Sequence, residues 1–154
     1  MQTLKLVNGA LEPYTEEAPV EITFAQWREG ARPEAGRFAL VLPNAAAVSE
    51  VADSIDGFSS IVLDFPTFRD GRAYSQARLL RERFGYRGEI RARGNVLRDQ
   101  IFFMARAGFD AFEIRDAEAA AFSEALGEFS VVYQPAADCA EPVWRRRLAR
   151  AIAA

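Results

Sequence analysis

The chain has 154 residues, of which 50% are hydrophobic and 27% are charged, which is typical of one soluble globular domain. Its net charge of −3 argues against a nucleic-acid binder, and the lack of a signal-peptide pattern or a long apolar run predicts a cytoplasmic protein without membrane contact. The absence of histidine and the single cysteine, Cys139, exclude an intrachain disulfide and argue against a metal site built by this chain alone.

The first 36 residues predict a small N-terminal cap. Asn8 and Gly9 lie between two apolar runs, and this dipeptide is the strongest short signal for a β-hairpin. Thr23 and Gln26 have the spacing of a capping box, which predicts the start of a short helix. The break ARPEAG at 31–36 separates this cap from the main body but is too short to mark a second domain.

From Arg37 onward, apolar runs alternate with helical patterns. The expected strands are FALVLP (38–43), SIVLDF (60–65), EIRARG (89–94), AFEIR (111–115) and SVVYQP (130–135). Helices are expected to start at Asn44, Asn95, Asp116 and Pro142, and a further helix should end at Gly85. The alternation predicts one α/β domain with right-handed βα units and a mainly parallel sheet: a cap at 1–36, a repeated body at 37–135 and a C-terminal helix at 136–154.

Two of the expected strands alternate polar and apolar residues, which strands covered by helices on both faces rarely do. The period of two places Asp64, Arg91, Glu113 and Arg93 on one face of the sheet. An arc of βα units with a polar concave face, like part of a TIM barrel, fits this pattern better than a doubly wound sandwich.

Three explanations of the polar face stay open. Asp64 and Glu113 can neutralise Arg91 in a buried ion-pair network. Alternatively, Asp64 and Glu113 form a catalytic acid/base pair and Arg91 and Arg93 hold an anion. A homo-oligomer that buries this face against itself is the third explanation.

The carboxyl ends of parallel strands meet at one edge, where ligands bind in this class of fold. The longest loop of that edge, FPTFRDGRAYS at 65–75, is rich in aromatic residues and arginine. Guanidinium groups and a helix N-terminus both favour anions, so we predict a small-oxyanion site. Its candidate ligands are Arg69, Arg72, Ser75, Arg91, Arg93 and Arg115.

Three phenylalanines are candidates for contact with a partner protein: Phe68 in the long loop, and Phe102 and Phe103 on a later helix. Burial in the core is the alternative for each, because large apolar side chains are mostly buried. The cofactor stays unknown: LPNAAA after the first strand of the body matches neither the dinucleotide fingerprint nor the P-loop.

Residues 64–114 resemble the bacterial domain-of-unknown-function family nine-three-four. The matching motifs are F-P-x-F-x-D-G-R-x-Y-S at 65–75, A-R-L-L-R at 77–81, G-Y-x-G-E at 85–89, V-L-R-D-Q at 96–100 and G-F-D-A-F-E at 108–113. Genes of this family often lie beside assimilatory sulfite reductase, and its members are labelled probable oxidoreductases or accessory proteins. The resemblance therefore implies a role in sulfite reduction, with sulfite reductase as a partner, and it implies no catalytic residues.

Two functions follow as hypotheses. The first is an accessory protein that binds sulfite reductase or a small oxyanion through the arginine-rich edge. The second is a small oxidoreductase of sulfur metabolism that uses Asp64 and Glu113. An oxidoreductase needs a cofactor or redox cysteines, which the motifs do not supply, although a flavin or siroheme site could be assembled with a partner.

Overall fold

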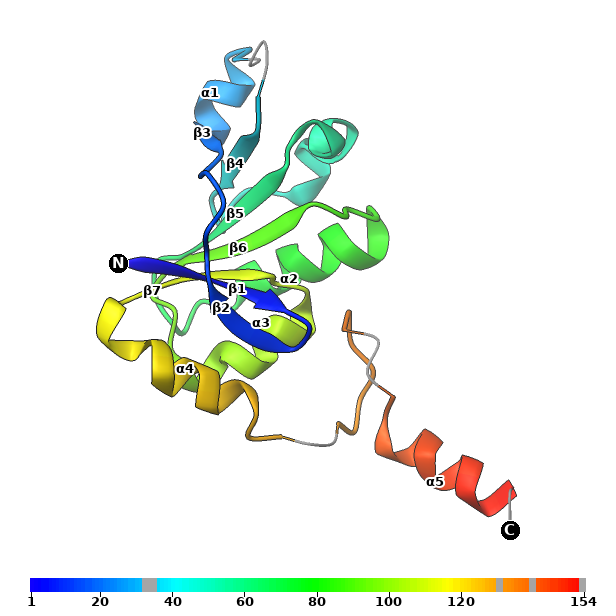
Figure 1. Cartoon of the computed structure of the whole chain (residues 1–154). Coiled ribbons are helices and arrows are strands. Elements are labelled where there is room, and N and C mark those ends of the chain that lie inside the picture. The colour runs from blue at the N-terminus through cyan, green and yellow to red at the C-terminus, as the bar shows by residue number, and fades with distance from the viewer. Residues whose placement is uncertain (32–35, 130–131, 139–140, 153–154) are drawn as a thin grey trace.

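The computed structural model describes residues 1–31, 36–129, 132–138 and 141–152. Within these residues, seven strands form one mixed sheet in the order β2-β1-β7-β6-β5-β4-β3 (Figure 1). The strands are β1 Gln2–Val7, β2 Ala10–Pro13, β3 Val20–Thr23, β4 Phe38–Leu42, β5 Ser60–Phe65, β6 Glu89–Gly94 and β7 Ala111–Ile114. Strands β3 to β7 are parallel and follow one another across the sheet, whereas β1 is antiparallel to β7 and β2. The predicted α/β class and mainly parallel sheet are confirmed.

Helices cover one face of this sheet. They are α1 Phe24–Arg28, η1 Val48–Glu50, η2 Ala52–Gly57, α2 Arg72–Arg78, the π-helical η3 Leu79–Arg83, η4 Arg98–Gln100, α3 Ile101–Ala107, η5 Asp116–Glu118 and α4 Ala119–Leu126, whereas the last helix, α5 Val143–Ile152, does not pack on the sheet (Figure 1). Because right-handed crossovers between successive parallel strands, from β3 to β7, place their connections on the same side, the core lies between the sheet and these helices. Leu63 and Ile90 of the strands share this core with Leu80 and Met104 of the helices and with Val51 between η1 and η2, and all five are fully buried.

Two local predictions are confirmed by backbone geometry. Asn8 and Gly9 take positive φ angles of 51° and 85°, as a two-residue turn between β1 and β2 requires. Thr23 accepts a hydrogen bond from the Gln26 amide, and the Gln26 side chain accepts one from the Thr23 amide at 2.9 Å. This capping box starts α1 where the sequence predicts it.

The segment after β4 differs from the prediction of a helix capped by Asn44. It forms two short 3-10 helices, η1 and η2, in a sequence rich in β-branched residues, Asp and Ser, which disfavour a regular helix. The Asn44 side chain instead donates a hydrogen bond to Asp70 at 2.7 Å. The helices expected at Asn95 and Asp116 likewise open with 3-10 turns, η4 and η5, so α3 and α4 begin later than predicted.

The expected strand at 130–135 is wrong for its described part, because residues 132–135 form no strand and 130–131 lie outside the described residues. The position beside β7 that it would occupy is taken by β1, which pairs with β7 from Gln2↔Ile114 to Lys5↔Ala111. The described residues of the segment 1–36 supply three strands, β1, β2 and β3, to the main sheet, and the division into a cap and a body stays a prediction. The likeness to part of a TIM barrel stays a prediction.

The other face of the sheet is polar, and a crossover segment, residues 14–19, runs over it from β2 at one edge to β3 at the other (Figure 1). The Tyr14 ring lies 4.8 Å from the guanidinium carbon of Arg91, and Glu16 forms ion pairs with Lys5 and Arg37. The middle of this face is therefore covered, and Val62 on it is fully buried. Polar side chains near the carboxyl ends of the strands stay partly accessible.

The C-terminal helix α5 begins at Val143, one residue after Pro142, and lies apart from the sheet (Figure 1). Its Trp144 and Leu148 side chains are 43% and 57% exposed. None of the helices in the described residues is long and apolar enough to cross a membrane.

Candidate functional site

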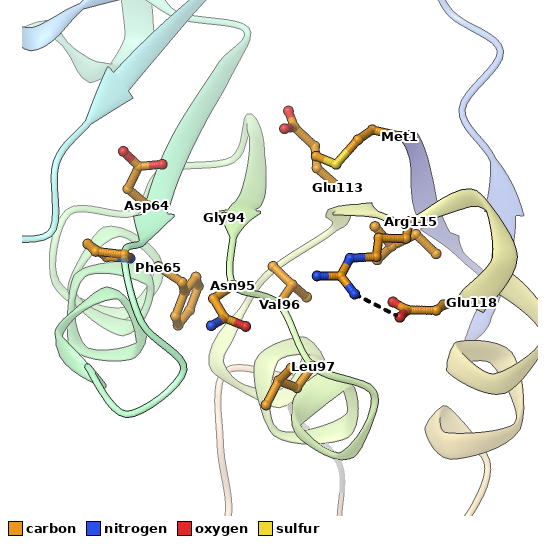
Figure 2. Close-up of a pocket in the computed structure, with 12 residues that line it drawn as sticks. Met1, Asp64, Phe65, Gly94, Asn95, Val96, Leu97, Glu113, Arg115 and Glu118 are labelled. Atoms are coloured by element: carbon orange, nitrogen blue, oxygen red, sulfur yellow. Dashed lines mark ion pairs between the residues drawn. The ribbon is translucent and has the colours of Figure 1, made fainter.

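A pocket of about 520 Å³ lies at the carboxyl edge of the sheet, where β5, β6 and β7 end (Figure 2). Its place follows from the parallel array, because these strands end at one edge and the loops after them form the walls. Its polar lining consists of Asp64, Asn95, Glu113, Arg115 and Glu118. Figure 2 shows Asp64 and Arg115 on opposite sides of the loop that follows β6.

Backbone forms the floor of this pocket. Gly94, the last residue of β6, has a φ of 96°, and the Asn95 amide donates a 2.8 Å hydrogen bond to the Phe65 carbonyl. A Cβ on Gly94 would lie 2.5 Å from that carbonyl oxygen, so only glycine fits without displacing the end of β5. The sequence indicated a loop at this point but gave no sign of the close approach.

Asp64 is the unpaired acid of the pocket. In the part of the chain that the structure describes, its carboxylate accepts no hydrogen bond and belongs to no ion pair, although Arg93 is its neighbour across the strands. Partial burial raises the pKa of Asp64 above its ordinary value, and the charges of Glu113 and Glu21 add to this, while Arg93 acts against it. Asp64 therefore holds a negative charge that nothing nearby compensates by direct contact.

We expect Asp64→Asn to raise the stability of the protein slightly at pH 7. A carboxyl group whose pKa is raised on folding costs stability at every pH where it is ionised, so the amide removes a penalty. The gain should shrink as the pH falls through the raised pKa of Asp64, since the wild-type carboxyl is then protonated. Thermal unfolding at pH 7 and at pH 4 measures both effects; the gain should be small because solvent reaches the group.

A matched control for this prediction is Asp53→Asn on η2, where the aspartate is exposed. That variant should change the midpoint little at either pH. A wild-type protein more stable than Asp64→Asn at pH 7 would show that Asp64 has a stabilising partner.

Glu113, the second predicted catalytic acid, is held in an ion pair. Its two oxygens accept hydrogen bonds of 2.8 Å each from Nε and Nη2 of Arg93. Arg93 also binds Glu21 from β3, and the hydrogen bonds that Arg93 donates to Glu113 and Glu21 raise its pKa. The negative charge of Glu113 is therefore compensated within the protein.

Arg91 is engaged deeper on the same face. It is 4% exposed, donates a 2.7 Å hydrogen bond to Glu89, and lies under the Tyr14 ring. Arg91 and Arg93, which were predicted to clamp an anion, thus have acids of their own. The geometry supports an ion-pair network that differs in part from the one expected: Arg91 lies 3.8 Å from Glu113, as expected, but its closest acid is Glu89, and Asp64 stays outside the network.

The remaining predicted ligands lie in three places. Arg115 lines the pocket, with its side chain 83% exposed and 3.8 Å from Glu118. Arg72 and Ser75 line a separate cavity of about 210 Å³ between η1 and α2. Arg72 also pairs with Asp70 at 2.6 Å and lowers the pKa of that carboxyl to about 2. Arg69 lies over the Phe68 ring, at 5.4 Å.

Exposed aromatic side chains form a separate surface on the outer side of α3. The ring centroids of Phe102 and Phe129 are 4.8 Å apart, and Phe103 lies 5.5 Å from Phe102. We call Phe102, Phe103 and Phe129 the aromatic surface; Phe103 and Phe129 are 53% and 52% exposed. Phe68 is 41% exposed, and its carbonyl accepts a 3.0 Å hydrogen bond from Gln100 just before α3. Phe129 was not predicted, because it follows the end of α4 and belongs to no periodic pattern.

A family model described as "Bacterial protein of unknown function (DUF934)" matches residues 39–144, more than half of the chain. The match includes the aromatic surface and all the residues named above as the polar lining of the pocket. It also extends on both sides of residues 64–114, the stretch whose motifs gave the resemblance. No curated protein matches the chain.

Proposed function

We propose that this chain, which belongs to the bacterial family of unknown function DUF934, is an accessory protein of assimilatory sulfite reduction that docks to sulfite reductase through the aromatic surface. The pathway and the partner come from the family resemblance, and a cytoplasmic location comes from the sequence pattern. The docking surface comes from the exposure of the aromatic side chains.

The exposed aromatic surface is the observation that carries this proposal. Phe103 and Phe129 are each more than half exposed although both contact Phe102. Burying a whole phenylalanine side chain contributes about 1.5–3 kcal/mol, so a partner that covers these rings gains appreciable binding energy. Clustered apolar residues on a surface are typical of protein–protein contacts, and aromatic residues are enriched at their centres.

The alternative, a small oxidoreductase with Asp64 and Glu113 as its acid/base pair, has less support. Glu113 is fixed by two hydrogen bonds from Arg93, and Arg93 also holds Glu21. These contacts give the three side chains a structural role in joining β3, β6 and β7. Arg93 would have to break its hydrogen bonds with these acids before it could bind an anion.

We expect Phe103→Ser to weaken the binding of purified sulfite reductase at least tenfold, measured by biolayer interferometry. A residue at the centre of an interface commonly contributes about 2 kcal/mol or more, and about 1.4 kcal/mol corresponds to a factor of ten. The fold should be preserved because the ring is half exposed, and thermal unfolding can check this.

Val20→Ser provides the control, because Val20 is a 63% exposed apolar residue on the edge strand β3. It should bind sulfite reductase as the wild type does. Equal binding by both variants would exclude the aromatic surface as the docking site. Normal sulfite reductase activity in cells lacking this protein would exclude the accessory role itself.

A further inference from the structure

We propose that the pocket at the carboxyl edge binds a small zwitterion of the amino-acid class, with its ammonium group against Asp64 and its anionic group against Arg115. This site is separate from the aromatic surface and does not depend on the docking proposal. It rests on the charges that line the pocket and on which of them are already compensated.

The acidic side of the pocket favours binding of a cationic hydrogen-bond donor. Asp64 and Glu113 both line it, but Glu113 is neutralised by Arg93, so Asp64 is the carboxylate left to a ligand. A partly desolvated carboxylate without a partner gains most from a charged donor, which restores the hydrogen bonds lost with water. A primary ammonium group supplies three such donors.

The opposite side offers a guanidinium group. Arg115 lies 3.8 Å from Glu118, farther than a hydrogen bond reaches, and its side chain is 83% exposed. It can therefore turn its donors toward a carboxylate or another oxyanion. The Met1 ammonium at the same rim already donates to Asp116 at 2.9 Å, so Arg115 is the cation there that a ligand can use.

The space between the two charges suits a small organic molecule. Phe65, Val96, Leu97 and Ile114 supply apolar wall, and Asn95 adds an amide. The volume of about 520 Å³ lies within the range of small-molecule sites, roughly 300–1,000 Å³. A simple oxyanion at Arg115 fits less well, because it would leave the carboxylate of Asp64 without a cationic partner, which a zwitterion supplies.

Saturation-transfer NMR with the full chain at pH 7 tests the proposal. The probes are the twenty proteinogenic L-amino acids one at a time, putrescine as an amine without an anionic group, and succinate as an anion without an amine. At least one amino acid should bind with a Kd of about 1 mM or lower, and more tightly than putrescine and succinate. Asp64→Asn and Arg115→Gln should each weaken that binding at least tenfold.

Asp53→Asn, an exposed acid on η2, is the matched control and should bind as the wild type does. Thermal unfolding of each variant separates loss of ligand from loss of fold; Asp64→Asn should lose the ligand while unfolding no earlier than wild type. The proposal is overturned if no amino acid binds, if succinate binds more tightly than every amino acid, or if folded Asp64→Asn retains wild-type affinity. Sulfite reductase is absent from the experiment, so failure of the docking proposal leaves its outcome unchanged.

Discussion

Gly94→Ala is expected to lower the free energy of unfolding by about 3 kcal/mol, because two independent costs add at this position. The φ angle of 96° is one that residues with a Cβ rarely adopt, which costs about 1–2 kcal/mol. The new methyl would also lie 2.5 Å from the Phe65 carbonyl oxygen and 3.1 Å from its carbon. Forcing extra volume into a close-packed place costs about 1–3 kcal/mol more. Chemical denaturation measures the difference.

The chain provides a matched control for the backbone part of this cost. Gly30 has the same φ of 96°, but a Cβ there would meet no atom within 4 Å. Gly30→Ala should therefore lose only the 1–2 kcal/mol or so of backbone strain. Equal losses for the two variants would mean that the end of β5 yields to the methyl group, and that the pocket floor is less fixed than the contact between Gly94 and Phe65 indicates.

The sequence predicts most of the parallel body because each strand there is a local apolar run between helical patterns. SIVLDF and EIRARG match β5 and β6 residue for residue. The same reasoning fails where pairing is decided far along the chain. Nothing local to SVVYQP reveals that β1 already occupies the side of β7 where that run would pair. An isolated apolar run is therefore evidence for a strand only when the sheet still has an edge to receive it.

The sequence predicts which residues meet at the candidate site, but not which of their charges are paired. The period of two placed Asp64 and Glu113 on the polar face, and parallel strands brought both to one pocket with Arg115. The pairing of charges could not be read from the sequence, because Arg93 takes Glu21 from a strand 72 positions earlier. An arginine in the sequence therefore predicts an accessible positive charge only where no acidic side chain from another part of the chain pairs with it.

The path of the chain over the polar face places the partners of its charged side chains beside them. The crossover segment carries the chain from one edge of the sheet to the other, and it brings Tyr14 over Arg91 and Glu16 to Lys5. A run of five residues from Thr15 to Pro19 shows no periodicity that would predict such a path. Its consequence is that the polar face is closed by the chain itself near β6, which leaves the carboxyl edge as the accessible part.

Arg91→Met is expected to lower the free energy of unfolding by up to about 3 kcal/mol, because it removes the closest charged partner of the buried Glu89 and leaves it with Lys5 at 3.7 Å and the Ser60 hydroxyl at 3.2 Å. The side chains of Arg91 and Glu89 are 5% and 8% exposed, and Glu89 Oε1 accepts the 2.7 Å hydrogen bond from Arg91. Lys5 lies 3.7 Å from the other Glu89 oxygen and is too distant to replace it by a hydrogen bond. Methionine fills much of the space, but it offers no hydrogen-bond donor to Glu89 and no positive charge to the Tyr14 ring.

Two further variants decide whether the buried charge is the cause. Arg78→Met removes an ion pair with Glu82 whose side chains are 55% and 46% exposed, and it should cost no more than about 1 kcal/mol. The double variant Arg91→Met with Glu89→Gln removes both charges, so it should be more stable than Arg91→Met alone. If Arg91→Met is instead as stable as wild type, Arg91 is not needed by Glu89, and its guanidinium group again becomes a candidate to bind an anion. Denaturation curves for the wild type and these three variants therefore separate a structural ion pair from a binding residue on the polar face.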